Sequence, residues 1–211
     1  MSGQGWNAGD ADLADAQILA IAAGVQDPEP LYRVIGLAGA AGSGKSTAAE
    51  LLAGHGFTRL RFAAPMKAAL AGLLANFGVS RDRIGRMIEG DLKEVPAPEL
   101  AHRTPRHAMQ TLGTDWGRDQ MDPDLWAGPM AQRGAEIAAA GGRVVFEDVR
   151  FSNEAAAIRA LGGLVVKIEG RGAELASGHA SEGFDFEPDA VLENASTLDA
   201  LEADLLALVF G

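Results

Sequence analysis

Short apolar runs alternate with longer amphipathic segments along most of the chain. Three of these runs, at residues 34–38, 143–147 and 164–168, have an unbroken apolar centre. A strand buried on both faces of a parallel sheet needs this composition, because neither of its faces meets water. Weaker runs at 57–62 and 190–192 are predicted to add two strands. Because helical segments separate the runs, the sequence predicts an α/β fold of three layers around a parallel sheet of about five strands.

The clearest helical periodicity follows the second predicted strand, which we expect to be closed by Ala64-Pro65. The apolar side chains recur at intervals of three and four residues, at Met66, Leu70, Leu73, Leu74 and Phe77. This spacing places them on one face of a helix. We expect the whole face to belong to the core.

Four further helices are marked by a residue suited to cap their first turn. These residues are Thr104, Asp122, Ser152 and Ser196. Pro105 and Pro123 follow the first two, and proline suits a first turn because its missing N–H is not needed there. We expect the second of these helices to end at Gly141-Gly142, with a kink at Gly128-Pro129. The last one carries leucines along one face, at Leu198, Leu201, Leu205 and Leu208.

Residues 10–23 form another predicted helix, with Asp10 as its cap and a rough apolar stripe. We interpret it as part of a helical extension, residues 1–30, of a single domain that spans residues 1–211. The segment starts among acidic residues, so it lacks the basic start of a signal peptide. No apolar stretch is long enough to span a bilayer, and we expect a cytoplasmic protein that has no membrane partner.

Charge and composition exclude several classes of function. The 211 residues include 29 acidic and 18 basic side chains, which gives a net charge of −11. A protein this acidic does not hold nucleic acid through bulk charge, so an anionic ligand must be bound by local clusters of Arg, Lys and backbone amides. The chain has no cysteine, which excludes disulfides, thiolate metal sites and cysteine nucleophiles.

A glycine-rich loop carries the strongest chemical signal. Residues 39–47, GAAGSGKST, fit the pattern G-x-x-x-x-G-K-[ST] between an apolar run and a predicted helix at 46–53. The N–H groups of such a loop surround phosphates, Lys45 adds a positive charge to the β- and γ-phosphates, and Ser46 offers a hydroxyl to Mg²⁺. The predicted phosphate-binding residues are Gly39, Ala41, Gly42, Ser43, Gly44, Lys45, Ser46 and Thr47. The loop predicts binding of a nucleoside triphosphate rather than a turn without a ligand.

Asp148 follows the apolar run 143–147, at the position where a second Mg²⁺ ligand is expected opposite Ser46. An ordinary aspartate at the end of a strand is the plain alternative. The chain has no Asn-Lys-x-Asp motif, which argues against a GTPase switch. Asp148 is followed by Val149 and not by a glutamate that could activate water, so transfer is favoured over hydrolysis.

Six segments between about Val34 and Asn194 form a further pattern in a fixed order. They are residues 36–47, 61–67 (RFAAPMK), 104–106 (TPR), 110–118 (QTLGTDWGR), 148–154 (DVRFSNE) and 179–182 (HASE). Together they resemble the phage-type deoxynucleoside monophosphate kinases, the family that includes the enzyme of T-even phages. That family usually has Leu or Ile where Met66 stands and Pro where Ser152 stands. Neither change removes a polar group that the chemistry needs.

The resemblance implies a P-loop kinase fold with a helical substrate-binding insertion and a lid. We place the insertion at residues 63–142, because a connection this long is usually functional. The polar, glycine-rich residues 170–183 are the candidate lid. The predicted catalytic residues are Lys45, Asp148, Arg150 and, at the start of the lid, Arg171. The matching group His179, Ser181 and Glu182 has no role that we can derive.

The resemblance also suggests which residues bind the acceptor. Two phosphate-bearing substrates require cations on both sides of the reaction, and Lys67, Arg106 and Arg150 are the candidates on the acceptor side. Gln110 is suited to hydrogen bonds with a base edge, and Trp116 is suited to stacking. Arg118 is a further candidate in the same insertion.

Each candidate also has a structural alternative. Trp116 and Trp126 would then serve as packing residues, and Arg61 would point to solvent from its strand. Arg118 would pair with Asp115 or Asp119 on its own helix.

These expectations define a kinase that moves a phosphoryl group from ATP to a deoxynucleoside 5′-monophosphate with Mg²⁺ as cofactor. Its partners would be small nucleotides, in the host cytoplasm if a phage encodes it, and a homodimer is left open. One alternative is a P-loop kinase for a hydroxyl acceptor such as dephospho-coenzyme A, with Asp148 as its base. A second alternative is a non-catalytic regulatory protein that binds ATP.

Overall fold

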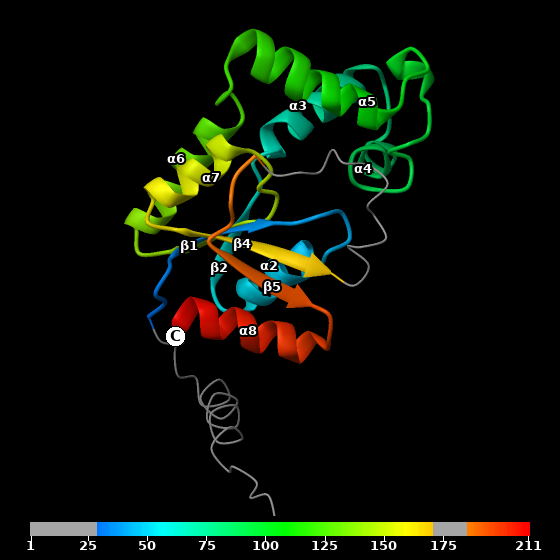
Figure 1. Cartoon of the computed structure of the whole chain (residues 1–211). Coiled ribbons are helices and arrows are strands. Elements are labelled where there is room, and N and C mark those ends of the chain that lie inside the picture. The colour runs from blue at the N-terminus through cyan, green and yellow to red at the C-terminus, as the bar shows by residue number, and fades with distance from the viewer. Residues whose placement is uncertain (1–28, 171–184) are drawn as a thin grey trace, which may run out of the picture.

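A parallel sheet lies between two layers of helices (Figure 1). The computed structural model describes residues 29–170 and 185–211, and five strands in these ranges pair in the order β2-β3-β1-β4-β5. The strands are β1 (Val34–Ala38), β2 (Phe57–Leu60), β3 (Arg143–Phe146), β4 (Leu164–Gly170) and β5 (Ala190–Asn194). Every neighbouring pair is parallel. The predicted three-layer α/β fold with five parallel strands is confirmed.

Seven α-helices lie in the described ranges. They are α2 (Lys45–Gly54), α3 (Ala64–Asn76), α4 (Arg81–Glu89), α5 (Pro105–Gln110), α6 (Ala127–Ala139), α7 (Ser152–Ala160) and α8 (Leu198–Phe210). A 3₁₀ turn η1 (Pro98–Leu100) and a π-helix η2 (Thr111–Met121) complete them. Helices α2 and α8 cover one face of the sheet and α6 and α7 cover the other, while α3, α4 and α5 extend beyond its edge (Figure 1).

Strand β1 occupies the centre of the sheet. It pairs with β3 on one side and with β4 on the other, and all five of its residues are buried. After β1 the chain passes to β2 at one side of the sheet, whereas after β3 it crosses to β4 on the other. Parallel strands bring their carboxyl ends to one edge of the sheet. Such sheets bind ligands at this edge, at the point where successive connections lead to opposite sides of the sheet.

Two apolar layers hold the helices on the sheet. Ile35 and Leu37 of β1 face α2 and α8, in a cluster that includes Leu205. The alternate residue Val34 faces α6 and α7, where the rings of Phe62 and Phe146 stack with centroids 4.5 Å apart. This alternation along β1 is what the period of two in a strand requires.

The insertion has a separate core. Buried side chains of α3, α4 and α5, together with Ala97 just before η1, form it: Leu70, Leu74, Ile84, Met87, Ile88, Ala97 and Met109. The expectation that the whole face from Met66 to Phe77 is core is therefore wrong in part. Leu73 and Phe77 are 46% and 54% exposed, because the packing of α3 on α4, α5 and η2 buries Leu70 and Leu74 instead.

Helix starts differ from the predicted ones at several positions. Thr104 caps α5 as expected, since its Oγ1 accepts the N–H of His107 at 3.1 Å. Asp122 instead accepts the N–H of Asp124 at 2.7 Å and forms a turn. Helix α6 therefore begins only at Ala127, and Pro129 lies in its first turn rather than at a kink.

The two predicted serine caps are also wrong. Ser152 is the first residue of α7, preceded by Phe151, and its Oγ donates to Asp185 at 2.9 Å. Thr197 rather than Ser196 caps α8, by accepting the N–H of Ala200 at 3.3 Å. Strand β2 ends at Leu60, so Ala64 and Pro65 open α3 instead of closing the strand.

The predicted N-terminal helix at 10–23 lies outside the described residues. Within the described ranges, no helix combines the length and the hydrophobicity that crossing a bilayer would require.

We expect two leucines of α8 to respond differently to truncation. Leu205 is 1% exposed in the core between α8 and the sheet, whereas Leu198 is 52% exposed. Leu205→Ala should lower the free energy of unfolding by about 2–5 kcal/mol, because it removes buried methyl groups and leaves a cavity. Leu198→Ala should stay within about 0.5 kcal/mol. Urea unfolding of both variants tests this, and equal losses would contradict the packing described for α8.

Candidate active site

The glycine-rich loop, residues 39–47, connects β1 to α2 at the carboxyl edge of the sheet. Gly39 has a φ of +143°, and a Cβ there would lie 2.4 Å from the carbonyl oxygen of Ile168. Gly44 has a φ of +105°, and a Cβ there would lie 2.2 Å from Nδ2 of Asn194. Both positions therefore require glycine for backbone conformation and for space. The loop is packed tightly against the ends of β4 and β5.

Asn194 contacts this loop, and the sequence analysis did not predict that contact. Its Nδ2 donates a hydrogen bond to the carbonyl oxygen of Ser43 at 3.0 Å. The predicted strand at 190–192 stopped short of it, because polar residues at the end of an edge strand carry no apolar signal. The contact makes Asn194 a positioning residue for the phosphate loop.

Two polar groups of the loop bear on what it could bind. Nζ of Lys45 donates to the carbonyl oxygens of Gly39 at 2.7 Å and Ala40 at 2.6 Å. Oγ of Ser43 is buried without a hydrogen-bond partner among the described residues, and a buried hydroxyl in that state costs free energy. The first-turn amides of α2 add N–H groups without partners inside the helix. These features fit an anionic ligand such as a polyphosphate.

A cavity of about 260 Å³ lies between the sheet edge and the insertion. Its core wall comes from the segments after β2 and β3, and its other wall comes from α3, α5, η2 and the loop after α4. Five cationic side chains line it: Lys67, Lys93, Arg106, Arg118 and Arg150. Among the described residues, two carboxylates also line it, Asp148 and Glu154. In a chain with a net charge of −11, this is a local excess of positive charge.

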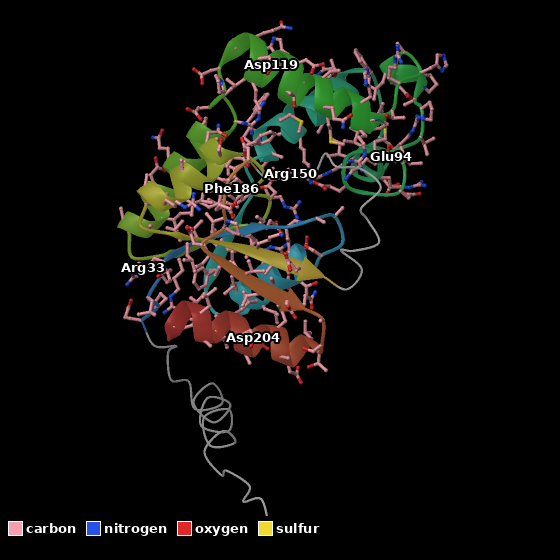
Figure 2. The ribbon with its side chains drawn as sticks, viewed as in Figure 1. Arg33, Glu94, Asp119, Arg150, Phe186 and Asp204 are labelled. Atoms are coloured by element: carbon pink, nitrogen blue, oxygen red, sulfur yellow. The ribbon has the colours of Figure 1, made fainter. Side chains whose placement is uncertain are left out.

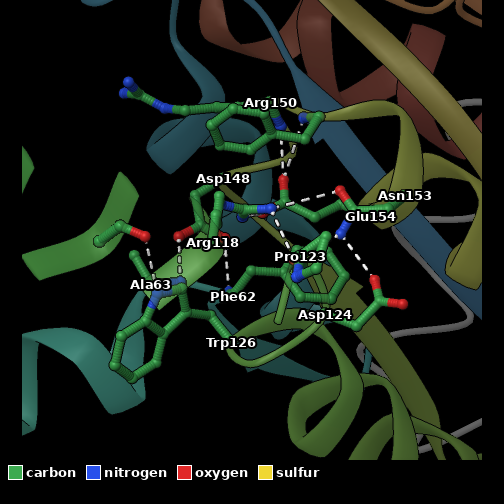
Figure 3. A network of polar contacts seen from close by, with 12 residues as sticks. Phe62, Ala63, Arg118, Pro123, Asp124, Trp126, Asp148, Arg150, Asn153 and Glu154 are labelled. Carbon is green, nitrogen blue, oxygen red and sulfur yellow. Dashed lines mark hydrogen bonds and ion pairs between the residues drawn. The ribbon is translucent and has the colours of Figure 1, made fainter. Parts of the chain in front are cut away.

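Asp148 reaches the cavity from the core wall (Figure 3). Its Oδ1 accepts the N–H of Phe62 at 2.8 Å, and its Oδ2 accepts the N–H of Ala63 at 3.1 Å. Burial raises the pKa of Asp148, while those N–H groups and the charges of Lys67 and Arg150 oppose the rise. A carboxylate fixed by two backbone donors is suited to present its remaining lone pairs to a cation.

Glu147, the neighbour of Asp148, is engaged differently. Arg61 donates from Nε to one of its oxygens and Arg59 donates to the other at 2.8 Å. Burial opposes ionisation of Glu147, but the hydrogen bonds from these arginines outweigh it and lower its pKa. The alternative that Arg61 simply points to solvent is therefore wrong. Glu147 already has two cationic partners.

Arg118 joins the insertion to the core (Figure 3). Its Nη2 donates to Oε1 of Glu154 at 2.6 Å, its Nη1 donates to the carbonyl oxygen of Pro123 at 3.1 Å, and its guanidinium lies 3.8 Å from the ring centroid of Phe151. Neither Asp115 nor Asp119, the alternatives on its own helix, is its partner. The sequence did not predict this pairing, because Glu154 lies 36 residues away.

Glu154 is buried in α7 and holds the segment before that helix. Its Oε2 accepts the N–H groups of Arg150 at 2.8 Å and Phe151 at 3.2 Å. The Arg150 backbone is therefore fixed, whereas its guanidinium points away from the network around Arg118 (Figure 3). Asn153 extends the junction by donating to Oδ1 of Asp124 at 2.7 Å.

The predicted acceptor residues are brought together, with one exception. Lys67, Arg106, Gln110, Arg118 and Arg150 all line the cavity. Trp116 does not, because it is 42% exposed on η2. Trp126 lines the cavity instead, and its Nε1 donates to the carbonyl oxygen of Gly113 at 2.9 Å.

Lys93 lines the cavity although nothing in the sequence singled it out. It lies in the loop after α4, next to Glu94, which Figure 2 places in the insertion, whereas Arg150 lies at the sheet. A lone lysine in a charged segment carries no signal of its own. Only the fold of the insertion brings it to the cavity.

Some predicted residues stay outside what the structure describes. Arg171, His179, Ser181 and Glu182 fall in residues 171–184.

Ser46 is the second residue of α2. Its hydroxyl and the carboxylate of Asp148 are the kind of oxygen donors that Mg²⁺ prefers. Residues 29–170 and 185–211 contain no cluster of three or more His, Asp or Glu side chains that could hold a metal by themselves.

The parallel α/β fold, with the glycine-rich loop after β1, is consistent with a P-loop kinase fold. A family model described as deoxynucleotide monophosphate kinase matches residues 97–205. A protein of Acanthamoeba polyphaga mimivirus described as a "Putative deoxynucleotide monophosphate kinase" is 33% identical over 195 residues, 83% of this chain and 95% of that protein. The chain therefore belongs to the deoxynucleotide monophosphate kinase family.

A solved structure, TT1252 from Thermus thermophilus, is also similar to part of the chain. Its sequence is 21% identical, and the match covers 83% of this chain and 95% of that one with a TM-score of 0.38. A similarity this weak does not bear on function. The family assignment, in contrast, agrees with the resemblance inferred from the motifs and makes the chain an enzyme rather than a regulatory protein.

The ion pair between Arg118 and Glu154 should contribute a measurable free energy to folding. The side chains are 13% and 3% exposed, so little solvent screens them. A double-mutant cycle of Arg118→Met and Glu154→Gln should give a coupling energy of about 0.5–3 kcal/mol. The matched cycle of Arg118→Met with Asp119→Asn should give a value near zero. Urea unfolding measures both, and equal couplings would contradict the pairing.

The raised pKa of Asp148 predicts a pH dependence with a definite sign. A carboxyl group whose pKa is higher in the folded than in the unfolded state binds more protons when folded, so the free energy of unfolding falls as pH rises. This loss begins near the ordinary pKa of 3.8 and is complete above the raised value.

Asp148→Asn removes this loss. The stability of the variant relative to the natural protein should therefore increase as pH rises from about 4 toward neutrality. Urea unfolding across that range gives the difference. A flat or decreasing difference would show that the carboxylate is not destabilised by burial.

Proposed function

We propose that the protein transfers the γ-phosphoryl group of ATP to a deoxynucleoside 5′-monophosphate and releases the two diphosphates. The observation that carries the proposal is a cavity lined by five described cations in a strongly acidic chain, at the same edge of the sheet as the phosphate loop. Membership in the deoxynucleotide monophosphate kinase family supports the same reaction. The substrates are then small nucleotides, because the overall negative charge repels a polynucleotide.

On the donor side, the phosphate loop would hold ATP. Its N–H groups and Lys45 bind the phosphates, with contacts proposed for Gly39, Ala41, Gly42, Ser43, Gly44, Ser46 and Thr47. Ser46 and Asp148 would hold Mg²⁺, which supplies charge neutralisation at the phosphates. Lys45 has to exchange its bonds to the carbonyl oxygens of Gly39 and Ala40 for bonds to the nucleotide.

On the acceptor side, Lys67, Arg106 and Arg150 would bind the monophosphate. Arginine suits this role because its planar group donates two parallel hydrogen bonds to phosphate oxygens. Gln110 is placed to bond a base edge, and Met66, Met109 and Trp126 offer an apolar wall for the base and the sugar. Arg118 acts as a positioning residue through Glu154, which fixes the backbone of Arg150.

A monophosphate acceptor brings its own anionic nucleophile. The reaction then needs alignment and charge neutralisation more than a general base. An acceptor of this kind also explains the excess of cations in the cavity, which a hydroxyl acceptor without a nearby phosphate would leave unused. Residues 170–183 with Arg171 remain the proposed lid, since transfer to the acceptor requires that water be excluded.

A panel of acceptors tests the proposal. Purified protein with ATP and Mg²⁺ should release ADP in a coupled assay when a deoxynucleoside monophosphate is present, and not without an acceptor. Chelation of Mg²⁺ should stop the release. Lys45→Ala should lower turnover by about a hundredfold or more, because a charge at the transferring phosphate is lost, with unchanged thermal unfolding. Release of ADP with dephospho-coenzyme A alone would favour the hydroxyl-acceptor alternative instead.

A further inference from the structure

Lys93 is held at the cavity by its own backbone. Its carbonyl oxygen accepts the N–H of Arg106, the second residue of α5, at 3.0 Å, and its N–H donates to the carbonyl oxygen of Gly90 at 3.3 Å. The loop after α4 is thereby fixed to the start of α5. Lys93 and Arg106 reach the cavity as neighbours, although they are separated in sequence.

The charged groups of the cavity divide into paired and unpaired ones. Lys67 donates to Glu89 at 2.8 Å, and Arg106 donates from Nε to Glu94. Arg118 pairs with Glu154 as described above.

Lys93 and Arg150 differ from these three. Within residues 29–170 and 185–211, neither side chain has a carboxylate within ion-pair distance. One of them belongs to the insertion and the other to the core wall. The cavity thus presents two cations, one from each wall, neither of which forms an ion pair with a carboxylate among the described residues.

The surroundings of Lys93 make its positive charge costly. Burial is the main reason that its pKa is lowered, and the charge of Lys67 adds to the effect. Arg106 acts in the same direction, while Glu89 and Glu94 oppose it. A half-buried ammonium group near two other cations gains most from a ligand that brings negative charge.

We propose that Lys93 is a substrate-binding residue that, together with Arg150, holds the phosphate dianion of the acceptor between the insertion and the core. This inference rests on the proposed function and deepens it. Arg150 would supply the two parallel hydrogen bonds of a guanidinium, whereas Lys93 would supply a compact point charge. The family resemblance and the motifs did not include Lys93, so its role follows from the cavity alone.

Steady-state kinetics of Lys93→Met test the role directly. The variant removes the charge and keeps the length of the side chain. The kcat/KM for the deoxynucleoside monophosphate should fall roughly ten- to hundredfold, the range for loss of a hydrogen bond to a charged group. The KM for ATP should stay within about twofold, because its phosphates rest on the glycine-rich loop.

Arg81→Ala is the matched control. Arg81 is an exposed cation at the start of α4, in the same insertion but outside the cavity. It changes the net charge by the same amount and should leave the acceptor kinetics unchanged. Equal losses in both variants would mean that the acceptor responds only to the overall field of the insertion, which would overturn the role of Lys93.

The pH profile adds a readout that packing would not move. In the natural protein, kcat/KM for the acceptor should fall as pH rises and Lys93 loses its proton. Because the pKa of Lys93 is lowered, this fall should begin before the pH reaches about 10.4, the ordinary pKa of lysine. Lys93→Arg keeps the charge to higher pH, so the alkaline decline should move upward. Lys67, Glu89, Glu94 and Arg106 surround the site in both proteins. A difference in the pH profile therefore reports the ionisation of residue 93 and not that of its neighbours. An unchanged decline in Lys93→Arg would contradict the proposal even if Lys93→Met fails to fold.

Binding without turnover separates this inference from the proposed function. In thermal unfolding, a deoxynucleoside monophosphate should raise the Tm of the natural protein more than the corresponding deoxynucleoside does. Lys93→Met should lose most of that difference and keep the Tm increase caused by ATP. If no deoxynucleoside monophosphate stabilises the natural protein or is phosphorylated, the proposed function fails. If it does both and Lys93→Met behaves like Arg81→Ala, only the role of Lys93 fails.

Discussion

The candidate site depends on the buried carboxylate of Glu154, which joins parts of the molecule that are distant in sequence. It accepts hydrogen bonds from Arg118 of the insertion and from the N–H groups of Arg150 and Phe151 before α7. A charge this deeply buried is tolerable only when it is fully paired. One buried side chain therefore links the insertion to the core and also fixes the backbone of Arg150, so the two walls of the cavity are joined at Glu154.

The protein combines a strongly acidic chain with a basic cavity. Carboxylates in the insertion hold individual cations, as Glu89 holds Lys67 and Glu94 holds Arg106. Such pairs fix long, flexible side chains that would otherwise lose conformational entropy on binding. The remaining acidic surface repels large polyanions, whereas the cavity attracts a small one. This distribution supports the proposal that the substrates are small nucleotides.

Much of the fold could be predicted from the sequence, because its signals are local. The apolar centre of β1 and the caps and prolines near α5 act within a few residues. The errors arose where a tertiary contact overrode a local preference. Ser152 bonds Asp185 instead of capping α7, and Leu73 on α3 is exposed because no element among the described residues covers it.

The phosphate loop was determined by sequence alone, since its glycines, Lys45 and Ser46 are consecutive and their conformation follows from φ angles that only glycine adopts readily. The acceptor cavity was decided by tertiary structure. Lys93 and Trp126 become wall residues only when the loop after α4 and the segment before α6 fold over the sheet edge. Their residue types carry no local signal of a ligand site, because a lysine in a charged loop is usually a solvated surface residue and a tryptophan usually packs in a core. Long-range pairing such as Arg118 with Glu154 depends on geometry that no spacing along the chain encodes.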